Sequence, residues 1–273
     1  MKTRYILFTI ALLAVSAFAR DAKSSESEDI ATTIAASFEE SASTKSTVLD
    51  GSSFQTGVWY NFYAIPETLS GGSVGQPVDL GLSVKWASWN VGASSPEEYG
   101  AYFAWGETEP SVNNNYDWPY YRWCDGSSNS LTKYNLNSSY GIVDNKTTLD
   151  LEDDAAHISW GGSWRMPTSA EFQELIDNCT AVWTTENGVN GRRFTSNIKG
   201  YTDKSIFIPA AGYRVGNYQG NSGLEAGSYG TCWSSTLNSG YPGTAHYLFI
   251  SSGGVYVNGF FRYGGNSIRP VCE

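Results

Sequence analysis

Side chains that carry catalysis or hold metal ions are scarce in this chain. Only two histidines, His157 and His246, occur among its 273 residues, and a catalytic triad needs an imidazole close to both a nucleophile and an orienting acid. The chain has no Gly-x-Ser-x-Gly segment to expose a nucleophilic serine on a strand-to-helix turn. The spacing of its cysteines fits no zinc pattern. The sequence therefore predicts no catalytic residues, no cofactor and no bound metal.

Charged residues make up only 16% of the chain, and the acids outnumber the bases, for a net charge of −10 at pH 7. Proteins that bind nucleic acid depend on clustered Lys and Arg to contact phosphates. We therefore expect no nucleic-acid partner, and the acidic excess indicates solubility.

Long apolar runs are confined to the amino terminus. Lys2 and Arg4 precede an apolar segment, Tyr5–Val15, that is short for a bilayer span. Ala17-Phe18-Ala19 then fits the small-x-small rule for signal-peptide cleavage. We predict a signal peptide over residues 1–19, without a cysteine for lipid attachment; an uncleaved anchor is the alternative. The protein is expected to be secreted, or periplasmic or on the cell surface, with no membrane span after cleavage.

Cysteines number only four: Cys124, Cys179, Cys232 and Cys272. An even number in an exported chain favours disulfides, although the sequence does not determine their pairing. A domain of this length also folds without such cross-links and keeps its cysteines as buried thiols. Both alternatives stay open at this point.

Aromatic residues and glycine are, by contrast, abundant, with 10 Trp, 18 Tyr, 12 Phe and 29 Gly. This composition is typical of an exported domain rich in strands and loops. Residues 20–57, dominated by Ser, Thr, Ala, Glu and Asp, predict a flexible and mostly disordered tether. Residues 58–75 predict a lead-in strand and loop, and residues 76–273 the folded domain.

Within that domain, alternating apolar residues from Val78 to Trp86 predict a pair of strands. Ser95 and Pro96 predict the start of a short helix, and Ala101–Trp105 a strand. Residues 106–145 form a long polar loop whose aromatic residues indicate that it packs. Further short strands are expected around Val182–Thr185, Gly191–Ser196, Ile206–Pro209, Gly230–Ser235, Ala245–Ile250, Gly254–Val257 and Ser267–Val271.

The clearest local signal is a helix start in the middle of the domain. Gly161-Gly162 predicts a turn, and Thr168 with Glu171 forms a capping box. We expect the helix to span Ser169–Asn178 and to bury an apolar face. Trp164 is expected to pack beneath this helix, and Arg165 to pair with an acid, so that the whole stretch is scaffold.

Several phrases together resemble the Fibrobacter succinogenes major paralogous domain family, exported proteins common in gut Bacteroidetes. They include Val78-Asp79-Leu80-Gly81-Leu82, Tyr102-Phe103-Ala104-Trp105-Gly106-Glu107, Trp160–Thr168, Pro209-Ala210-Ala211-Gly212-Tyr213-Arg214, Trp233-Ser234-Ser235 and Ser267-Ile268-Arg269-Pro270-Val271. The resemblance covers about residues 76–273. It implies an α+β domain with a C-type-lectin-like fold, many short strands and loops and one or two short helices, related to formylglycine-generating enzymes and to retroelement-diversified variable proteins. It implies no known activity. The closing Ser-Ile-Arg-Pro-Val strand would lie beside the first strand of the domain.

The candidate binding residues are the aromatic, Asn and Arg residues of the C-terminal loops. Rigid aromatic side chains spaced by Gly, Ser and Asn are typical of a recognition surface, although core aromatics and loop filling also produce this composition. We predict ligand contacts from Tyr213, Arg214, Asn217, Tyr218, Asn238, Tyr241, Tyr256, Asn258, Phe260, Arg262 and Tyr263; Asn221, Tyr229 and Phe261 belong to the same wider group.

Acidic residues offer two weaker alternatives. The run Asp150 to Asp154 supplies oxygen ligands for calcium, but it lacks the spacing of a calcium loop, and capping of a short helix by Asp153 or Asp154 is the simpler interpretation. Glu107 and Glu109 could be combined with these acids as a glycosidase pair. The sugar-binding Glu-Pro-Asn motif of calcium-dependent lectins is absent.

Three functional hypotheses follow. The first is an exported, non-catalytic binding protein for a glycan or protein ligand at the cell surface. The second is a hydrolase or an enzyme of the formylglycine-generating type, for which Cys232 and Cys272 are the available thiols. The third is a structural component of the cell envelope or of a fimbria tip, and retroelement diversification of the C-terminal part is compatible with the first and third.

Overall fold

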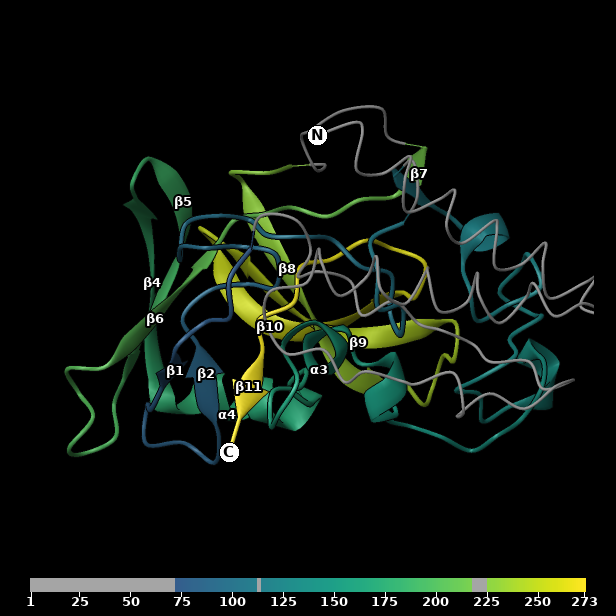
Figure 1. The fold of residues 1–273 in the computed structure, drawn as a ribbon, viewed down its shortest axis with the longest axis horizontal. Coiled ribbons are helices and arrows are strands. Elements are labelled where there is room, and N and C mark those ends of the chain that lie inside the picture. Colours follow the sequence, from purple (N-terminus) through teal and green to yellow (C-terminus); the bar gives the residue numbers. More distant parts are fainter. Residues whose placement is uncertain (1–71, 112–113, 218–224) are drawn as a thin grey trace, which may run out of the picture. The chain divides into compact units, whose positions relative to one another are not determined.

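The computed structural model describes residues 72–111, 114–217 and 225–273 (Figure 1). The predicted signal peptide, tether and most of the lead-in segment lie outside these residues. Short antiparallel sheets dominate the described part, with few and short helices, so the general α+β class is confirmed. In this part of the chain no helix combines the length and the apolar character needed to cross a membrane.

The first sheet joins the two ends of the domain. Its strands β1 (Pro77–Val78), β2 (Lys85–Ala87) and β11 (Val271–Cys272) lie in the order β1-β2-β11. Trp86 of β2 is paired with Val78 on one side and Val271 on the other. The closing strand thus returns to the start of the domain as expected, but it pairs with β2 rather than β1, and of the predicted strand Ser267–Val271 only Val271 belongs to β11. Trp86 is completely buried.

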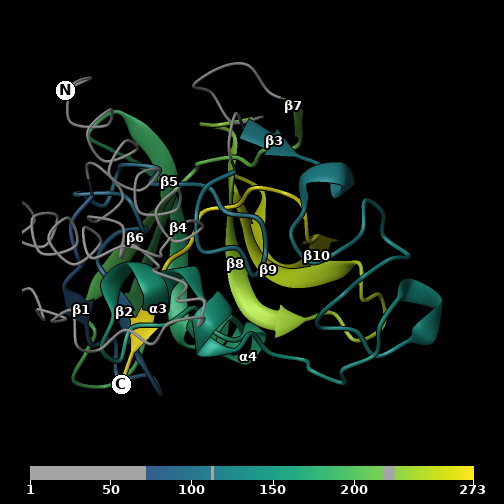
Figure 2. The same ribbon diagram turned by 45° about the vertical axis from the view of Figure 1, so that its right-hand side comes forward.

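The second sheet is a meander of β4 (Cys179–Glu186), β5 (Val189–Ser196) and β6 (Ser205–Pro209). Its first hairpin turns at Asn187-Gly188, both with positive φ, as a two-residue hairpin turn requires. The third sheet has the order β10-β9-β8 and contains β8 (Tyr229–Leu237), β9 (Thr244–Ser251) and β10 (Gly254–Phe261). Figure 2 shows its strongly curved strands beside α4. All these strands were expected, but β10 extends four residues beyond Val257 because its pairing with β9 continues to Phe261.

Helix α4 (Ser169–Asn178) has the predicted bounds. Thr168 Oγ1 accepts a hydrogen bond from the Glu171 N–H at 3.2 Å, and the Glu171 carboxylate accepts from the Thr168 N–H at 2.7 Å, which confirms the capping box. Arg165 donates to both Glu171 oxygens, at 2.9 and 2.6 Å, so its predicted acidic partner is confirmed. Trp164 packs edge-on against Trp160 of α3 (Ala155–Trp160), with ring centroids 5.2 Å apart.

Two expected elements are wrong. Residues after Ser95 form turns rather than a helix. The Glu98 carboxylate accepts a hydrogen bond from the Ser94 N–H at 2.7 Å, and Gly100 adopts a positive φ that ends the turn. Ala101–Trp105 contributes one bridge, between Phe103 and Asn266, instead of a strand.

The long segment 106–145 packs as expected. It contains β3 (Asn115–Tyr116), which pairs with β7 (Gly216–Asn217), and the short 3-10 helices η3 (Trp118–Tyr120) and η4 (Ser138–Tyr140). The buried hydroxyls of Tyr116 and Tyr121 donate hydrogen bonds to the backbone oxygens of Tyr102 and Trp105, each at 2.7 Å. A buried Tyr needs such a partner, so these bonds hold the loop on the domain.

All four cysteines are free thiols, which decides between the two alternatives for them. Cys179, Cys232 and Cys272 are buried. Cys179 and Cys232 belong to the core between α4 and the sheets, together with Leu175 and Leu248. They act there as small apolar side chains.

Candidate functional site

The sheet β8-β9-β10 has two chemically different faces. Successive side chains of a strand point to opposite faces. Leu248, Ile250, Val255 and Val257 on one face belong to the core cluster that contains Phe172 and Leu175 of α4. The opposite face is aromatic. It carries Tyr229 and Trp233 from β8, Tyr247 and Phe249 from β9, and Tyr256, Asn258 and Phe260 from β10.

Four rings on the aromatic face form a row that crosses all three strands. Tyr213 and Tyr229 stack with centroids 5.8 Å apart and an interplanar angle of 23°. Tyr229 and Phe249 follow at 5.3 Å and 33°, and Phe249 and Tyr256 at 4.9 Å and 22°. We call Tyr213, Tyr229, Phe249 and Tyr256 the aromatic ladder. Because β10 is the edge strand, Tyr256 is its last ring.

The ladder is partly open to solvent. Tyr256 is 46% exposed, and Tyr213, Tyr229 and Phe249 are half-buried. Beside the ladder, Phe260 contacts Tyr213 at 5.0 Å and the buried Trp233 at 6.2 Å. Rigid rings supported from beneath lose little conformational entropy when a ligand binds, and the ladder therefore has the properties of a pre-formed contact surface.

Four of the predicted ligand residues lie on this face: Tyr213, Tyr256, Asn258 and Phe260. Asn258 is exposed and stands opposite Tyr247. Its Oδ1 accepts a hydrogen bond from the Gly259 N–H at 2.8 Å, which leaves its amide NH2 as a donor on the edge strand.

Asn238 and Tyr241 lie in the turn between β8 and β9. Tyr241 is 67% exposed. Asn238 packs against β10, since a Cβ added at Gly259 would lie 2.9 Å from its Nδ2. This turn therefore borders β10 near its C-terminal end.

Tyr263 belongs to a second aromatic group, with Trp118 of η3 and Phe261 of β10. Tyr263 stacks on Phe261 at 5.5 Å with an angle of 7°, and Trp118 stands edge-on to Tyr263 at 5.0 Å. Phe261 is 49% exposed. This group is a second, smaller surface of aromatic rings.

The two predicted arginines are structural. Arg262 is completely buried and donates to the Tyr121 hydroxyl and to the backbone oxygens of Lys133, Tyr134 and Pro242 at 2.9 to 3.1 Å. Arg214 is also buried, stacks over Tyr102 at 4.3 Å and donates to Asn114 at 3.1 Å. Their guanidinium groups are therefore placed for holding loops, and the expectation that they contact a ligand is corrected.

Two further predicted residues are only partly accounted for. Asn217 pairs with Asn115 through the β7 backbone, and Tyr218 lies outside the described residues, as does Asn221. Sequence reasoning missed Phe249 and Tyr247 of β9 as members of the aromatic face. The alternation of Tyr247 and Phe249 in one strand with Tyr256, Asn258 and Phe260 in the next was the available signal.

The acidic run is neutralised by lysines. Asp150, Glu152 and Asp153 come close enough to share a cation, and the Lys133 ammonium lies among them at 2.9, 3.2 and 2.6 Å. Asp154 accepts hydrogen bonds from the Ala156 and His157 N–H groups at 2.9 and 3.0 Å. The predicted helix-capping role of this residue is thus confirmed.

Three of the groups considered for catalysis, Cys232, Cys272 and Glu107, are packed in the scaffold, whereas Glu109 is exposed. Burial raises the pKa of the Cys232 thiol to about 12 and also raises that of Cys272, so both are protonated at neutral pH. Burial likewise raises the pKa of Glu107, whose carboxylate accepts the Arg122 N–H at 2.9 Å. A buried protonated thiol is a poor nucleophile.

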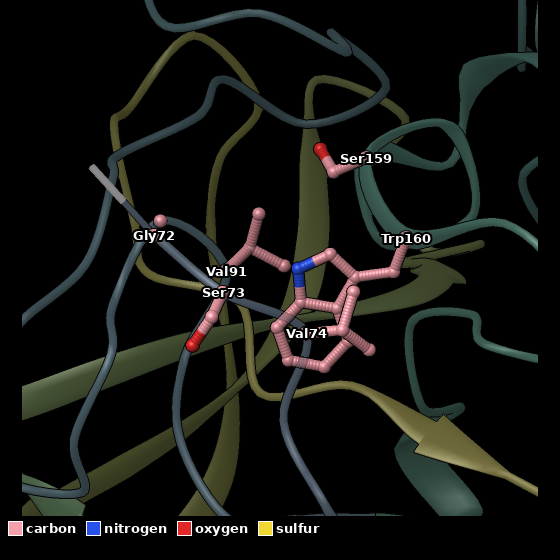
Figure 3. Close-up of a pocket in the computed structure, with 7 residues that line it drawn as sticks. Gly72, Ser73, Val74, Val91, Ser159 and Trp160 are labelled. Atoms are coloured by element: carbon pink, nitrogen blue, oxygen red, sulfur yellow. The ribbon is translucent and has the colours of Figure 1, made fainter. Parts of the chain in front are cut away.

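A small pocket lies at the start of the described chain. Figure 3 shows Trp160 beside Val74 and Val91, with Ser73 and Ser159 at the margin. No charged side chain lines it. The pocket is a gap in the packing around the indole ring of Trp160, and its lining contains no reactive side chain.

Comparison with family models, with curated proteins and with solved structures finds no match to this chain. The resemblance drawn from the sequence phrases therefore stays a prediction.

Proposed function

We propose that this chain is an exported, non-catalytic binding protein that recognises a glycan or protein ligand at the cell surface through the aromatic face of β8-β9-β10. The observation that carries the proposal is the aromatic ladder. It is a row of pre-positioned rings that ends in an exposed tyrosine. Exposed aromatic surface of this kind is uncommon without a partner.

The physical reason for ligand binding is that rings contribute large contact area at low entropic cost. The ladder suits the apolar face of a sugar ring as well as an aliphatic or aromatic side chain. Exposed Asn258 adds a hydrogen-bonding amide beside the rings.

For the fold we propose the C-type-lectin-like class. The pairing of β11 with β2 at the two ends of the domain and the sparse helices support this assignment. Export through a signal peptide, with a tether before the domain, is proposed on the sequence pattern of residues 1–57.

The test is a glycan array and a cell-surface binding assay with the mature chain and two variants. Tyr213→Ala removes a half-buried ladder ring, whereas Tyr120→Ala removes a 64% exposed ring outside the ladder. Loss of one well-packed contact ring is expected to weaken binding about 10-fold or more, corresponding to hot-spot energies of ~2 kcal/mol. Tyr120→Ala should bind like the parent.

Equal binding by the parent and Tyr213→Ala would remove the ladder as the site. Thermal unfolding of each variant shows whether a loss of binding comes from unfolding. Incorporation into an envelope polymer without any soluble ligand would favour the structural hypothesis instead.

A further inference from the structure

Among the residues that the structure describes, the outer side of strand β10 has no backbone partners at Val255 and Val257. This strand is the edge of its sheet, and its hairpin with β9 closes through two residues, Ser252 and Gly253, between the paired Ser251 and Gly254. In such a hairpin the flanking pair exchanges both hydrogen bonds, and the pairs then alternate along the ladder. Gly254, Tyr256, Asn258 and Phe260 therefore bond to β9, and the residues between them direct their N–H and C=O groups outward.

Those outward groups are free in the described structure at Val255 and Val257, for which no backbone partner outside the hairpin occurs. The next outward N–H, at Gly259, is taken by the side chain of Asn258 at 2.8 Å. Because Gly259 is one of the residues expected to direct its N–H outward, this bond supports the same outward direction for the N–H groups of Val255 and Val257.

Two other strand edges are covered at particular positions. The outer side of β8 is bridged by Gly212 at Gly230 and by Ser267 at Cys232. On edge strand β4, the Arg192 guanidinium donates to the Ala181 oxygen at 2.6 Å. Natural proteins also protect edge strands with proline or with charged side chains, lysine above all. Strand β10 contains neither proline nor a charged residue from Gly254 to Phe261.

The open edge is held rigidly. Arg192 is buried and donates to the Ser251 oxygen at 2.9 Å, which fixes the β9–β10 turn to the neighbouring sheet. Val255 and Val257 pack into the core below. An added strand would thus meet a backbone that is already ordered, and pre-organisation lowers the cost of binding.

The aromatic ladder ends at the same place. The rings of Phe249 and Tyr256 stack across β9 and β10, so one face of Tyr256 looks toward the sheet interior and the other toward the open edge. The side chain of a residue placed beside Tyr256 on a further strand would continue the stack. Free backbone groups and a free ring face therefore occur at one position.

We propose that β10 is a strand-addition site, at which an extended, uncharged peptide segment of a partner pairs with Val255 and Val257 and sets an aromatic side chain against Tyr256. Main-chain hydrogen bonds supply the affinity in this mode of recognition and alternate side chains the specificity. No residue of β10 is charged, so the edge offers no ion-pair partner to a charged segment, and the chain as a whole carries −10. An acidic segment would be repelled, and an uncharged one loses no ionic hydration.

The inference rests on the proposed function, since it assigns a partner class to one end of the aromatic face. The probe is a set of blocked, uncharged nonapeptides made of Thr and Val around a central Phe, Tyr, Trp or Ala. Binding to the full mature chain is measured by amide NMR shifts and exchange. We expect the Val255 and Val257 amides to shift and become protected, while the amides of Tyr256 and Asn258, already bonded to β9, change little.

Two comparisons isolate the mechanism. The central aromatic peptides should bind up to about fivefold more tightly than the Ala peptide, because only they extend the ladder. N-methylation of the peptide N–H groups that face β10 should weaken binding about tenfold or more, because it removes ladder hydrogen bonds without changing side chains.

Variants give the matching result on the protein side. Val257→Pro removes an outward N–H and is tolerated on an edge strand, whereas Asn258→Lys adds a protective charge at an exposed position. Both should reduce peptide binding, and the N-methylated peptide keeps the test decisive if Val257→Pro does not fold.

Three results would overturn the inference. They are N-methylated peptides that bind as well as their parents, no binding of any probe at millimolar concentration to the folded chain, and a peptide-free dimer that shows the same Val255 and Val257 shifts. The last result would assign the edge to a second copy. Unchanged ligand binding in Tyr213→Ala, together with the expected peptide pairing at Val255 and Val257, would instead contradict only the proposed function of the ladder interior.

Discussion

The ammonium group of Lys133 lies among three carboxylates, 2.6 Å from Asp153 and within 3.2 Å of Asp150 and Glu152. Its side chain is 17% exposed and that of Asp153 only 5%. Buried acids require a cation or several donors. Lysine fills the position that a metal ion would take, so that the cluster ties segment 106–145 to the 3-10 helix η5 (Leu151–Asp153).

These contacts make the stability of the domain depend on pH. Burial by itself lowers the pKa of Lys133, but its hydrogen bonds to Asp153, Asp150 and Glu152 raise that pKa well above its usual value. Hydrogen bonds from Lys146 and Lys133 lower the pKa of Asp150. A lowered acid pKa stabilises the fold above the unfolded value, about 3.9 for Asp, and this stability is lost as the pH falls through the folded pKa. The raised Lys133 pKa stabilises the fold below about 10.4 and this stability is lost at higher pH.

Lys133→Met is therefore expected to lower the free energy of unfolding by about 2–4 kcal/mol at pH 7, because it leaves the nearly buried Asp153 without its cation. Toward pH 2 the loss should shrink, because protonation of Asp150, whose pKa is lowered, removes one of the charges that the cation offsets. Urea unfolding at both pH values measures the difference. Lys146→Met is the control, with a side chain that is 44% exposed, and should cost less than about 1 kcal/mol. The same loss at both pH values would contradict this account.

At the scale of elements, α4 shows how a helix start is stabilised by one residue before it. Thr168→Ala removes the acceptor for the Glu171 N–H and should lower the free energy of unfolding by ~1 kcal/mol, within a range of roughly 0.5–2. Thr168→Ser keeps the hydroxyl and should retain most of the stability. Thermal unfolding compares the two, and an alanine variant as stable as the serine one would show that the cap contributes nothing.

This helix could be predicted from the sequence residue by residue, because its capping box and apolar face are local signals. The turn after Ser95 could not, because the same Ser-Pro start is diverted by the bond from Ser94 to Glu98. The end of β10 was missed because Asn258 and Gly259 are typical of loops. Only the eight-residue pairing with β9 keeps them in a strand.

The candidate site was predictable in composition but not in arrangement. Tyr213, Tyr256 and Phe260 were identified because aromatic residues spaced by Gly and Asn indicate recognition. Arg262 lies between Phe261 and Tyr263, so its sequence surroundings resemble those of the aromatic residues that indicate recognition. Its burial depends on the Tyr134 oxygen, 128 residues away along the chain, and such long-range pairing of a cation leaves no local signal.

At the scale of the whole domain, the first and last strands of the domain are held in one sheet. Val271 is completely buried, pairs with Trp86, and exchanges two backbone hydrogen bonds with Arg165 at 3.0 and 2.9 Å. The closing strand therefore connects β2 to the turn that starts α4. Pairing between distant segments closes a long loop, and such contacts form only when the whole domain folds.

Deletion of Pro270–Glu273 should consequently abolish cooperative folding rather than trim a loose end. Burial of the Val271 side chain alone stabilises the fold by about 1.5–3 kcal/mol, and the deletion also leaves the Ala87 N–H and the backbone groups of Arg165 without their hydrogen-bond partners. Near-UV circular dichroism of the buried tryptophans and urea unfolding measure the effect. Deletion of the exposed Glu273 alone is the control and should change the free energy of unfolding by less than about 0.5 kcal/mol. If the four-residue deletion unfolds as cooperatively as the control, then the closing strand does not hold the ends of the domain together, and β1 with β2 must be stabilised by their core contacts with Phe172 alone.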